Sequence, residues 1–247
     1  MYIYKRTRKL IKSKNDQLSH WLVPLLVMKK IVALMLGFFL QRKSNPFFPK
    51  TPNAFKKKCV YTVLIGDYDH LQEPEMVAEG WDYLCITNNP NLTSSVWTFI
   101  HINDEGMDPV RLSRKYKICN HLVDSEYDIS IYIDANIQIK KNLDSFLAIS
   151  WNNLADIAIL YHPYHTDVTQ EFRACLGRNL DNAELIKSQK KTYFDSGFED
   201  KYPQVNNRLI IRRTSNHRIK RLMNEWFNQI LNHSFRDQLS FNYVLEK

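Results

Sequence analysis

The sequence is poor in glycine, and the spacing of its glycines excludes three common kinds of catalytic or nucleotide-binding site. Only six glycines occur among the 247 residues, and no two are spaced as in GxGxxG, GxxxxGK or GxSxG. The dinucleotide-binding fingerprint, the phosphate-binding P-loop and the nucleophile elbow of α/β hydrolases each need one of these patterns. The sequence therefore offers no glycine-rich cradle for a phosphate.

Cysteine is also scarce, which limits the metal sites that the chain could form. The four cysteines stand at positions 59, 85, 119 and 175, so none forms a CxxC pair, and the sequence has no HExxH. These absences argue against a structural zinc site and against a zincin-type protease. Four scattered cysteines are typical of a reducing compartment. We therefore expect any bound metal ion to have oxygen ligands.

Acidic residues are nearly absent from the first part of the chain. Residues 1–58 hold 14 of the 34 Lys and Arg residues but one of the 26 Asp and Glu residues, which gives this segment a net charge of +13. The remaining 20 basic and 25 acidic residues give residues 59–247 a net charge of −5. We interpret the chain as a basic arm and linker, 1–58, followed by one domain, 59–247. Because a groove that follows nucleic-acid phosphates needs clustered cations, we expect no nucleic-acid partner for this domain.

Two apolar runs within the arm, residues 21–28 and 31–40, are separated by Lys29 and Lys30. A membrane span needs about 20 mainly apolar residues, and each central lysine costs about 2.5–3.5 kcal/mol of insertion free energy. We therefore expect the arm to lie on a membrane surface, peripheral to the inner, cytoplasmic face, with its cations near anionic headgroups. The alternatives are a helix packed on the domain and a frayed basic tail. Three prolines in residues 45–53 indicate an extended linker.

Beyond the linker, apolar β-branched runs alternate with segments of helical periodicity. Strands are predicted at 59–65, 82–87, 96–101, 128–133, 156–161 and 207–212, and helices at 112–123, over most of 168–191 and at 217–232. Strands separated by helices favour an α/β fold with a mixed, mainly parallel sheet flanked by helices. In the last helix, Trp226 and Phe227 belong to one wide apolar face, so we expect them in the core rather than in a sugar-stacking platform.

Polar residues follow several of the predicted strands. Ligands of open α/β sheets collect outside the carboxyl ends of the strands. The residues expected there are Gly66, Asp67, Tyr68 and Asp69, then Thr87 and Asn88, then Asp134 and Asn136, and finally His162. Asp134 and Asn136 supply oxygen ligands of the kind that suit Mg²⁺ or Mn²⁺. A nucleotide diphosphate bound at this edge would need such a divalent cation to neutralise it.

Six short motifs of the domain resemble the glycosyltransferase-like TOD/MUCI family. They are residues 61–69 (YTVLIGDYD), 83–88 (YLCITN), 111–117 (RLSRKYK), 130–137 (SIYIDANI), 162–163 (HP) and 236–241 (RDQLSF), spread over residues 59–247. The resemblance implies a GT-A-like, Rossmann-like fold and transfer of a sugar from a nucleotide-sugar donor, expected to be UDP-linked. The acceptor is expected to be a glycan or a lipid-linked molecule.

The resemblance also implies roles for individual donor-binding residues. Gly66, Asp67, Tyr68, Thr87 and Asn88 would hold the base and ribose, Arg111, Arg114 and Lys117 would contact the phosphates, and Asp134 with Asn136 would bind the cation that bridges the diphosphate. Asn136 departs from a strict Asp-x-Asp pattern. Because Asn136 is a neutral ligand, metal affinity is expected to be weak or to depend on Asp134 alone.

Sugar transfer also requires groups near the reacting carbon. Asp237 and Gln238 are expected to face the sugar and acceptor, and His162 is expected to act as a base or to hold a phosphate. If the reaction inverts the sugar configuration, a carboxylate or histidine must accept the acceptor proton. Asp237 is the first candidate, and Glu199 and Asp200 are its rivals; a retaining reaction would need no such base.

Structural roles and other functions remain as alternatives. Asp134 could cap a helix that begins near Lys140, Asp237 could cap a helix entry, and Glu171 suits the first turn of a helix in any case. The same carboxylates and His162 could serve a metal-dependent hydrolase. The chain could also be a non-catalytic, membrane-associated scaffold.

Overall fold

The computed structural model describes residues 55–66, 69–119, 121–124, 126–151 and 155–247. The apolar runs of the arm, together with Asp67 and Tyr68, therefore lie outside the described residues. The strands are β1 (Lys58–Leu64), β2 (Trp81–Thr87), β3 (Thr98–His101), β4 (Ile129–Ile133), β5 (Ile157–Tyr161) and β6 (Val205–Arg213). In the described ranges, no helix is both long and apolar enough to cross a membrane.

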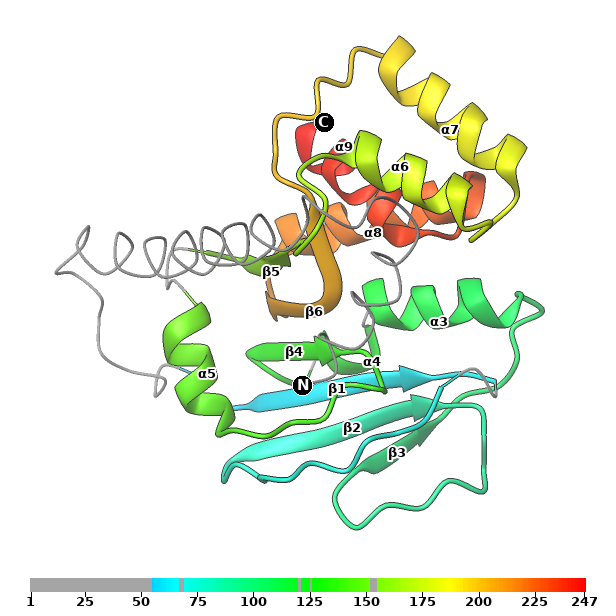
Figure 1. Cartoon of the computed structure of the whole chain (residues 1–247). Coiled ribbons are helices and arrows are strands. Elements are labelled where there is room, and N and C mark those ends of the chain that lie inside the picture. The colour runs from blue at the N-terminus through cyan, green and yellow to red at the C-terminus, as the bar shows by residue number, and fades with distance from the viewer. Residues whose placement is uncertain (1–54, 67–68, 120, 125, 152–154) are drawn as a thin grey trace, which may run out of the picture. The chain divides into compact units, whose positions relative to one another are not determined.

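The six strands form one mixed sheet in the order β3-β2-β1-β4-β6-β5 (Figure 1). β1 pairs in parallel with β2 and β4, β2 pairs in parallel with β3, and β6 is antiparallel to both β4 and β5. The predicted α/β fold with a mixed, mainly parallel sheet is thus confirmed. Because only β6 runs against the others, the carboxyl ends of β1 to β5 and the start of β6 share one edge of the sheet.

The helices are α3 (Pro109–Ile118), α4 (His121–Asp124), α5 (Leu143–Ser150), α6 (Val168–Gly177), α7 (Ala183–Asp195), α8 (His217–Asn232) and α9 (Phe241–Glu246), with the 3₁₀ turn η2 at Asp237–Leu239. The helix predicted over 168–191 is therefore two helices. Asn182 starts the second by accepting hydrogen bonds from the N–H groups of Glu184 and Leu185. Likewise, the helix expected near Lys140 begins at Leu143, after the N-cap Asn142.

Successive side chains of a strand point to opposite faces of the sheet, so the core has one part on each face. Tyr61 of β1 and Tyr132 of β4 lie in one buried cluster with residues of α3, α8 and α9. Val60 and Ile131 lie in a second buried cluster with residues of α5. Trp226 is fully buried and Phe227 is 8% exposed, both in the first cluster, which confirms their predicted place in the core.

A third buried cluster holds the C-terminal turn η2 close to helices α6 and α7. Phe172 of α6, Ile186 of α7 and Leu239 of η2 belong to it, and α6 contacts both α7 and η2. The indole N–H of Trp226 donates to the backbone oxygen of Asp237 at 3.0 Å. Because Trp226 is buried in the core, this bond fixes the position of η2 relative to the sheet.

Candidate active site

The carboxylate of Asp134 stands at the edge of the sheet where β4 ends. Its backbone N–H donates to the oxygen of Arg208 on β6 at 3.0 Å, and the Tyr132 hydroxyl donates to its Oδ1 at 2.9 Å. The cap of α5 is Asn142, whose Oδ1 accepts from the N–H of Ser145 at 3.0 Å. The alternative role of Asp134 as a helix cap is therefore wrong.

Helix α3 is held at both ends, and this fixes the cations on its inner face. At its start, the Asp108 side chain accepts from the N–H of Arg111 at 2.9 Å. At its end, the fully buried guanidinium of Arg212 donates to the carbonyls of Lys117 and Ile118, where a cation also interacts favourably with the helix dipole. Arg114 and Lys117 are thereby directed toward η2 and Asp134.

Four predicted site residues from three parts of the chain meet there. The Lys117 ammonium lies 2.6 Å from Oδ2 of Asp237 and 3.7 Å from Oδ1 of Asp134, while Nε of Arg114 lies 3.6 Å from Asp237. The side chains of Lys117 and Asp237 are 3% and 6% exposed. Lys117 therefore joins the carboxylate at the end of β4 to the carboxylate of η2. We name these four residues, Arg114, Lys117, Asp134 and Asp237, the central charge cluster.

The surroundings of Asp237 make it a poor proton acceptor. Burial would raise the pKa of this carboxyl, but the charges of Lys117 and Arg114 and the hydrogen bond from Lys117 outweigh burial and hold the pKa well below its usual range. A carboxylate with so low a pKa has little affinity for a proton, so the geometry argues against the predicted role of Asp237 as general base. It suits an anchor for the two cations instead.

Arg208, which the sequence reasoning missed, occupies the place predicted for the metal ion. Its Nε lies 3.1 Å from Oδ2 of Asp134, and its Nη2 lies 2.5 Å from Oδ1 of Asn136. The pairing of β5 with β6 is irregular here, with Ile159 opposite Ile210 but Leu160 opposite Asn206, so residues 207–209 form a bulge. Bulges redirect side chains next to active sites, and neither periodicity nor motif spacing signals one in this sequence.

The oxygen atoms that could bind a divalent cation nevertheless gather at this point. The Asn136 amide donates to Oδ2 of Asp69 at 2.8 Å, so Asp69, Asp134 and Asn136 lie together. Carboxylate and amide oxygens are the ligands that Mg²⁺ and Mn²⁺ prefer, so the donor set suits the predicted ion. The Arg208 side chain is 52% exposed, which leaves it room to move aside for a metal ion.

The residues predicted for the base and ribose are partly brought together. Gly66 has a positive φ of 70° and its N–H donates to Oδ1 of Asn88 at 3.1 Å, so the ends of β1 and β2 are joined. Thr87 is fully buried, and its hydroxyl accepts from the N–H of Asn89 at 3.1 Å, which stabilises the local turn. The positions of Asp67 and Tyr68 are outside the described residues.

Arg111 does not join the central charge cluster. Its guanidinium donates to the carbonyls of Ile230 and His233 at 3.1 Å each, and its Nη1 pairs with Asp108 at 3.1 Å. These partners hold the start of α3 against the end of α8. Arg114 and Lys117 therefore stay the candidates for the predicted phosphate contact, whereas Arg111 connects two helices.

Gln204 connects His162 and Gln238 by hydrogen bonds at the same edge of the sheet. The N–H of His162 donates to the Gln204 carbonyl at 2.8 Å, and the Gln204 amide donates to the backbone oxygen of Gln238 at 2.9 Å. The Gln238 amide in turn donates to the carbonyl of Val205 at 3.2 Å. The strand exit after β5 and the turn η2 are thus connected directly across the start of β6.

The two rival bases have structural roles. Asp200 has a positive φ of 56°, and its Oδ2 accepts from the N–H of Val168 at the start of α6 at 2.8 Å. Burial raises the pKa of this carboxyl. Glu199 is exposed and pairs with Lys201 at 3.1 Å. Neither carboxylate contacts the central charge cluster by any described interaction.

Buried polar atoms near Asp237 indicate room for a polar ligand or ordered water. Oε1 of Gln204, whose amide bonds the backbone of Gln238, and Nε of Arg236 are buried without a hydrogen-bond partner in the part of the chain that the structure describes. The Arg236 guanidinium also contributes to the low pKa of Asp237. Buried polar groups are nearly always hydrogen-bonded, so these two atoms next to η2 suit a polar ligand or an ordered water.

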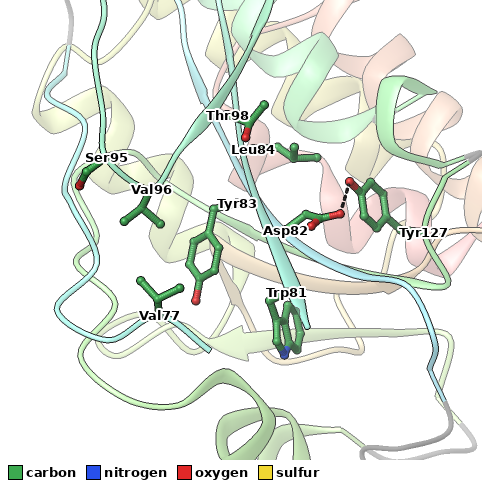
Figure 2. Close-up of a pocket in the computed structure, with 9 residues that line it drawn as sticks. All are labelled: Val77, Trp81, Asp82, Tyr83, Leu84, Ser95, Val96, Thr98 and Tyr127. Atoms are coloured by element: carbon green, nitrogen blue, oxygen red, sulfur yellow. Dashed lines mark hydrogen bonds between the residues drawn. The ribbon is translucent and has the colours of Figure 1, made fainter. Parts of the chain in front are cut away.

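A separate hollow lies at the other end of the strands and does not suit a diphosphate (Figure 2). It has a volume of about 600 Å³ and is lined mainly by side chains near the starts of β2 and β3. Its charged residue, Asp82, accepts a hydrogen bond from the Tyr127 hydroxyl at 2.8 Å. Since none of the nine lining residues carries a positive charge, the sheet edge remains the better candidate for an anionic donor.

Comparison with known families agrees with the family resemblance seen in the sequence. Residues 53–247 match the model described as TOD1/MUCI70, glycosyltransferase-like domain, which is far more than half of the chain. A search of curated proteins found no match. With its mixed α/β sheet and charged sheet edge, the chain belongs to the TOD1/MUCI70 glycosyltransferase-like domain family.

Proposed function

We propose that this domain transfers a sugar from a UDP-linked donor to a glycan or lipid-linked acceptor, with the donor lying along the carboxyl edge of the sheet. The observation that carries the proposal is the meeting of Arg114, Lys117, Asp134 and Asp237 at this edge. The family supports a glycosyltransferase in general. The donor, the acceptor and the use of metal are our inferences.

The order of the strands suggests how the donor lies. Neighbouring strands are about 4.8 Å apart, so the edge from β2 to β5 spans four such spacings, or about 19 Å. The base and ribose would lie near Gly66 and Asn88, the diphosphate near Asp134 and Lys117, and the sugar near η2 and His162. This length suits an extended nucleotide sugar with its reactive end toward β5.

The charges at the edge suit a leaving diphosphate. Four cations, Arg114, Lys117, Arg208 and Arg236, surround three carboxylates, those of Asp69, Asp134 and Asp237. As the bond to the sugar breaks, negative charge develops on the diphosphate, and fixed cations stabilise that charge. Asp237 keeps Lys117 and Arg114 in position before the donor binds, which avoids reorganisation during the reaction.

We further propose that Mn²⁺ or Mg²⁺ assists the reaction. Asp134, Asn136 and Asp69 would hold the ion, which when bound would neutralise part of the diphosphate charge. Arg208 contacts the same oxygens, so it competes with the ion and keeps the carboxylate paired when no ion is bound. The basic arm would hold the enzyme at the cytoplasmic membrane surface, near a lipid-linked or anionic acceptor.

The proposal is tested by measuring donor binding and donor cleavage together. UDP-hexoses, UDP-N-acetylhexosamines and UDP-pentoses are screened with Mn²⁺, with the melting temperature and the release of UDP as readouts. We expect at least one donor to raise the melting temperature and to release UDP, and Asp134→Ala to abolish both effects. Asp156→Ala is the matched control, because Asp156 pairs with Arg213 just before β5, at the other end of the strands.

The products separate this function from its alternatives. A transferase gives a glycosylated acceptor, and its UDP release rises with acceptor concentration. Free sugar or cleaved lipid without any dependence on acceptor would identify a hydrolase. If no donor in the screen changes the melting temperature or is cleaved, the proposed transferase activity is wrong.

A further inference from the structure

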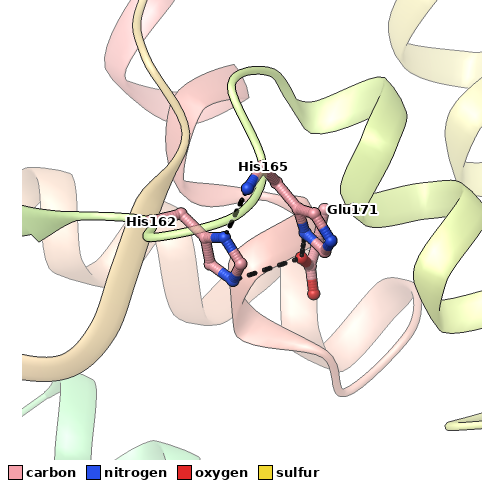
Figure 3. A group of neighbouring side chains, drawn as sticks. All are labelled: His162, His165 and Glu171. Atoms are coloured by element: carbon pink, nitrogen blue, oxygen red, sulfur yellow. Dashed lines mark hydrogen bonds and ion pairs between the residues drawn. The ribbon is translucent and has the colours of Figure 1, made fainter. Parts of the chain in front are cut away.

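A second group of ionisable side chains lies after the carboxyl end of β5 and on α6, at the same edge of the sheet as the central charge cluster. His162 and His165, in the loop after β5, meet Glu171 of α6 (Figure 3). The sequence reasoning treated Glu171 as an ordinary acid of a first helical turn and assigned no role to His165. An acid that only stabilises the start of a helix can stay in contact with water, yet the Glu171 side chain is only 5% exposed. Its burial calls for a specific partner.

That partner is the imidazole of His165. Its Nδ1 lies 2.5 Å from Oε2 of Glu171; because an ionised carboxylate can only accept, we assign the ring proton to Nδ1, which donates a hydrogen bond to Glu171. The other ring nitrogen, Nε2, has no hydrogen-bond partner among the residues that the structure describes, and the side chain is 16% exposed. A histidine with one nitrogen held by a buried carboxylate and the other free has the arrangement of an oriented general base.

The ring of His162 supports this orientation. Its Nδ1 accepts from the N–H groups of Tyr164 and His165, at 3.2 and 2.8 Å, which fixes the proton of the neutral ring on Nε2. Burial and the neighbouring His165 lower the pKa of His162, against the opposing effect of Glu171, so His162 is neutral at pH 7. The two imidazoles stack with their centroids 4.2 Å apart and an angle of 11° between their planes.

A metal ion is a poorer explanation for the same three side chains. Their ligand atoms lie within 4.8 Å of one another, which an ion could bridge. However, the lone pairs of a histidine lie in the plane of its ring, and two parallel stacked rings cannot direct their lone pairs at one ion. Turning His162 would also break both of the hydrogen bonds that its Nδ1 accepts from the backbone.

Three side chains, on α6, just after it and just before η2, interact with the pair of His165 and Glu171, which we call the dyad, or with a side chain next to it. On α6, the thiol of Cys175 lies 3.6 Å from Oε1 of Glu171, and burial with the nearby carboxylate raises the pKa of that thiol to about 12, so the thiol stays neutral. Arg178 follows α6 and acts on His162, and Arg236 precedes η2 and acts on both Cys175 and Asp237. Arg236 therefore lies between Cys175, which contacts Glu171, and Asp237 of the central charge cluster.

The dyad also lies where the proposed donor would end. β5 is two strands from β4, or about 10 Å along the edge, so the loop after β5 lies beyond the diphosphate position at Asp134. The sugar and the acceptor hydroxyl would lie in between. Asp237, the first candidate for the base, is held as an anion by Lys117 and Arg114, so the position of the base is open.

We propose that His165 is the general base of sugar transfer and that Glu171 positions it; this rests on the proposed transferase function. The acceptor hydroxyl oxygen forms a bond to the anomeric carbon of the sugar as its proton passes to Nε2 of His165. The bond from that carbon to the diphosphate oxygen breaks, and its electron pair leaves with the UDP. The imidazolium of His165 is paired with Glu171 and then releases its proton to water, which corresponds to a single displacement with inversion.

The test compares kinetics, donor binding and the histidine tautomer in the full chain. His165→Gln removes the base, Glu171→Gln removes the carboxylate charge, and His217→Gln is the matched control at the exposed start of α8. We expect His165→Gln to lower kcat for UDP release by about 10²- to 10⁴-fold while the Kd for UDP changes less than twofold. His217→Gln should keep the kcat of the wild type, and the anomeric configuration of the product should be inverted.

Nitrogen-15 NMR of the imidazoles supplies a readout that does not depend on turnover. We expect His165 in the wild type to carry its proton on Nδ1, and Glu171→Gln to alter that signal and to lower kcat without changing the Kd for UDP. A wild type that cleaves a donor while His165→Gln keeps more than a tenth of its kcat would overturn the proposal. So would a proton on Nε2 of His165, or one metal ion per chain that is lost in His165→Gln.

Failure of the transferase function itself has a different signature. In that case the wild type cleaves no donor in the screen and none of them changes its melting temperature. Both the transferase function and the catalytic role of His165 are then wrong. If the wild type is active and His165→Gln keeps its kcat, His165 is not the base, and the proposed transferase function is unaffected.

Discussion

At the residue scale, the pair of Lys117 and Asp237 shows how a buried charge can be stabilised by its position. Each partner is nearly inaccessible to water, and Arg114 adds a second cation to the same carboxylate. Taking charges out of water is unfavourable, so such a pair persists only where geometry and additional partners compensate. We therefore interpret the pair as part of a preformed anion-binding site, and not as an interaction that stabilises the fold.

Removing one partner of this pair should be costly. Asp237→Asn leaves Lys117 buried beside Arg114 with Asp134, 3.7 Å away, in place of its nearest counter-ion, and we expect the free energy of unfolding at pH 7 to fall by about 3–5 kcal/mol. Urea denaturation measures the change. Asp195→Asn, which breaks the exposed pair with Lys191, is the control and should cost less than about 1 kcal/mol. Equal losses for the two variants would contradict the burial argument.

The same carboxylate should make stability depend on acid. The pKa of Asp237 in the folded chain lies below its ordinary value of 3.8, so its contribution is fully present above that value and is lost as the pH falls toward the folded pKa. The difference in unfolding free energy between wild type and Asp237→Asn should therefore be constant from about pH 8 to pH 5 and shrink below about pH 4. Urea titrations at a series of pH values test this, and a gap that widens in acid would refute it.

Arg208 should control the affinity for metal. Because its guanidinium contacts both Asp134 and Asn136, Arg208→Ala frees these oxygens for a cation. We expect the variant to bind Mn²⁺ more tightly than the wild type, as measured by calorimetry or by metal-induced change in melting temperature. Arg218→Ala, at an exposed position on α8, is the control. Weaker Mn²⁺ binding by Arg208→Ala would mean that Arg208 supports the ion instead of competing with it.

At the scale of elements, α3 is the part that makes the site. One of its faces packs in the core through Leu112 and Tyr116, while Arg114 and Lys117 point to the sheet edge. Its C-terminal carbonyls are bonded by the buried Arg212 of β6. Because β6 also carries Arg208, the helix and the opposite wall of the site are positioned by one strand.

The start of α3 should contribute measurably to stability. Asp108→Ala removes the hydrogen bond to the N–H of Arg111, and the loss of such a cap costs about 1 kcal/mol. Since the hydrogen bonds from Arg111 outweigh burial and lower the pKa of Asp108, this contribution should also be lost in strong acid. Chemical denaturation at pH 7 measures it, with Asp195→Ala as a surface control. No difference between the two variants would show that the cap is dispensable.

At the scale of the whole molecule, charge is divided between a basic arm and an acidic domain. The arm, residues 1–58, has a net charge of +13 and the remainder of the chain −5. A polybasic segment is attracted to anionic lipid by about 1 kcal/mol per cation near the surface, and salt screens the attraction. The domain, being acidic, would gain nothing from such a surface.

Binding to lipid should therefore depend on the arm. We expect the full chain to float with vesicles that contain phosphatidylserine in 0.1 M salt and to be released in 0.5 M salt. Lys29→Glu with Lys30→Glu should weaken binding, whereas Lys187→Glu with Lys191→Glu, at exposed positions on α7, should not. Equal weakening by both pairs would mean that total charge, and not the arm, determines the binding.

Most of the fold could be predicted because its signals are local. The run from Ile129 to Ile133 is apolar except for Ser130 because that strand is buried on both faces, and the stripe with Trp226 and Phe227 has the period of a helix. The misplaced boundaries have local causes as well: the N–H groups of Val96 and Trp97 bond to the Ser94 hydroxyl, so β3 starts two residues late.

The sequence by itself determined the strands and helices, the charge division and the residues at the strand ends, because each depends on neighbours along the chain. The tertiary structure alone decided which of those residues meet. Arg114 and Arg111 are three residues apart on one helix, yet one faces Asp237 and the other the end of α8. Arg208 contacts Asp134 from a bulge in β6, and His165, in the loop after β5, contacts Glu171 of α6. Such pairings depend on how distant segments pack, which no local pattern encodes.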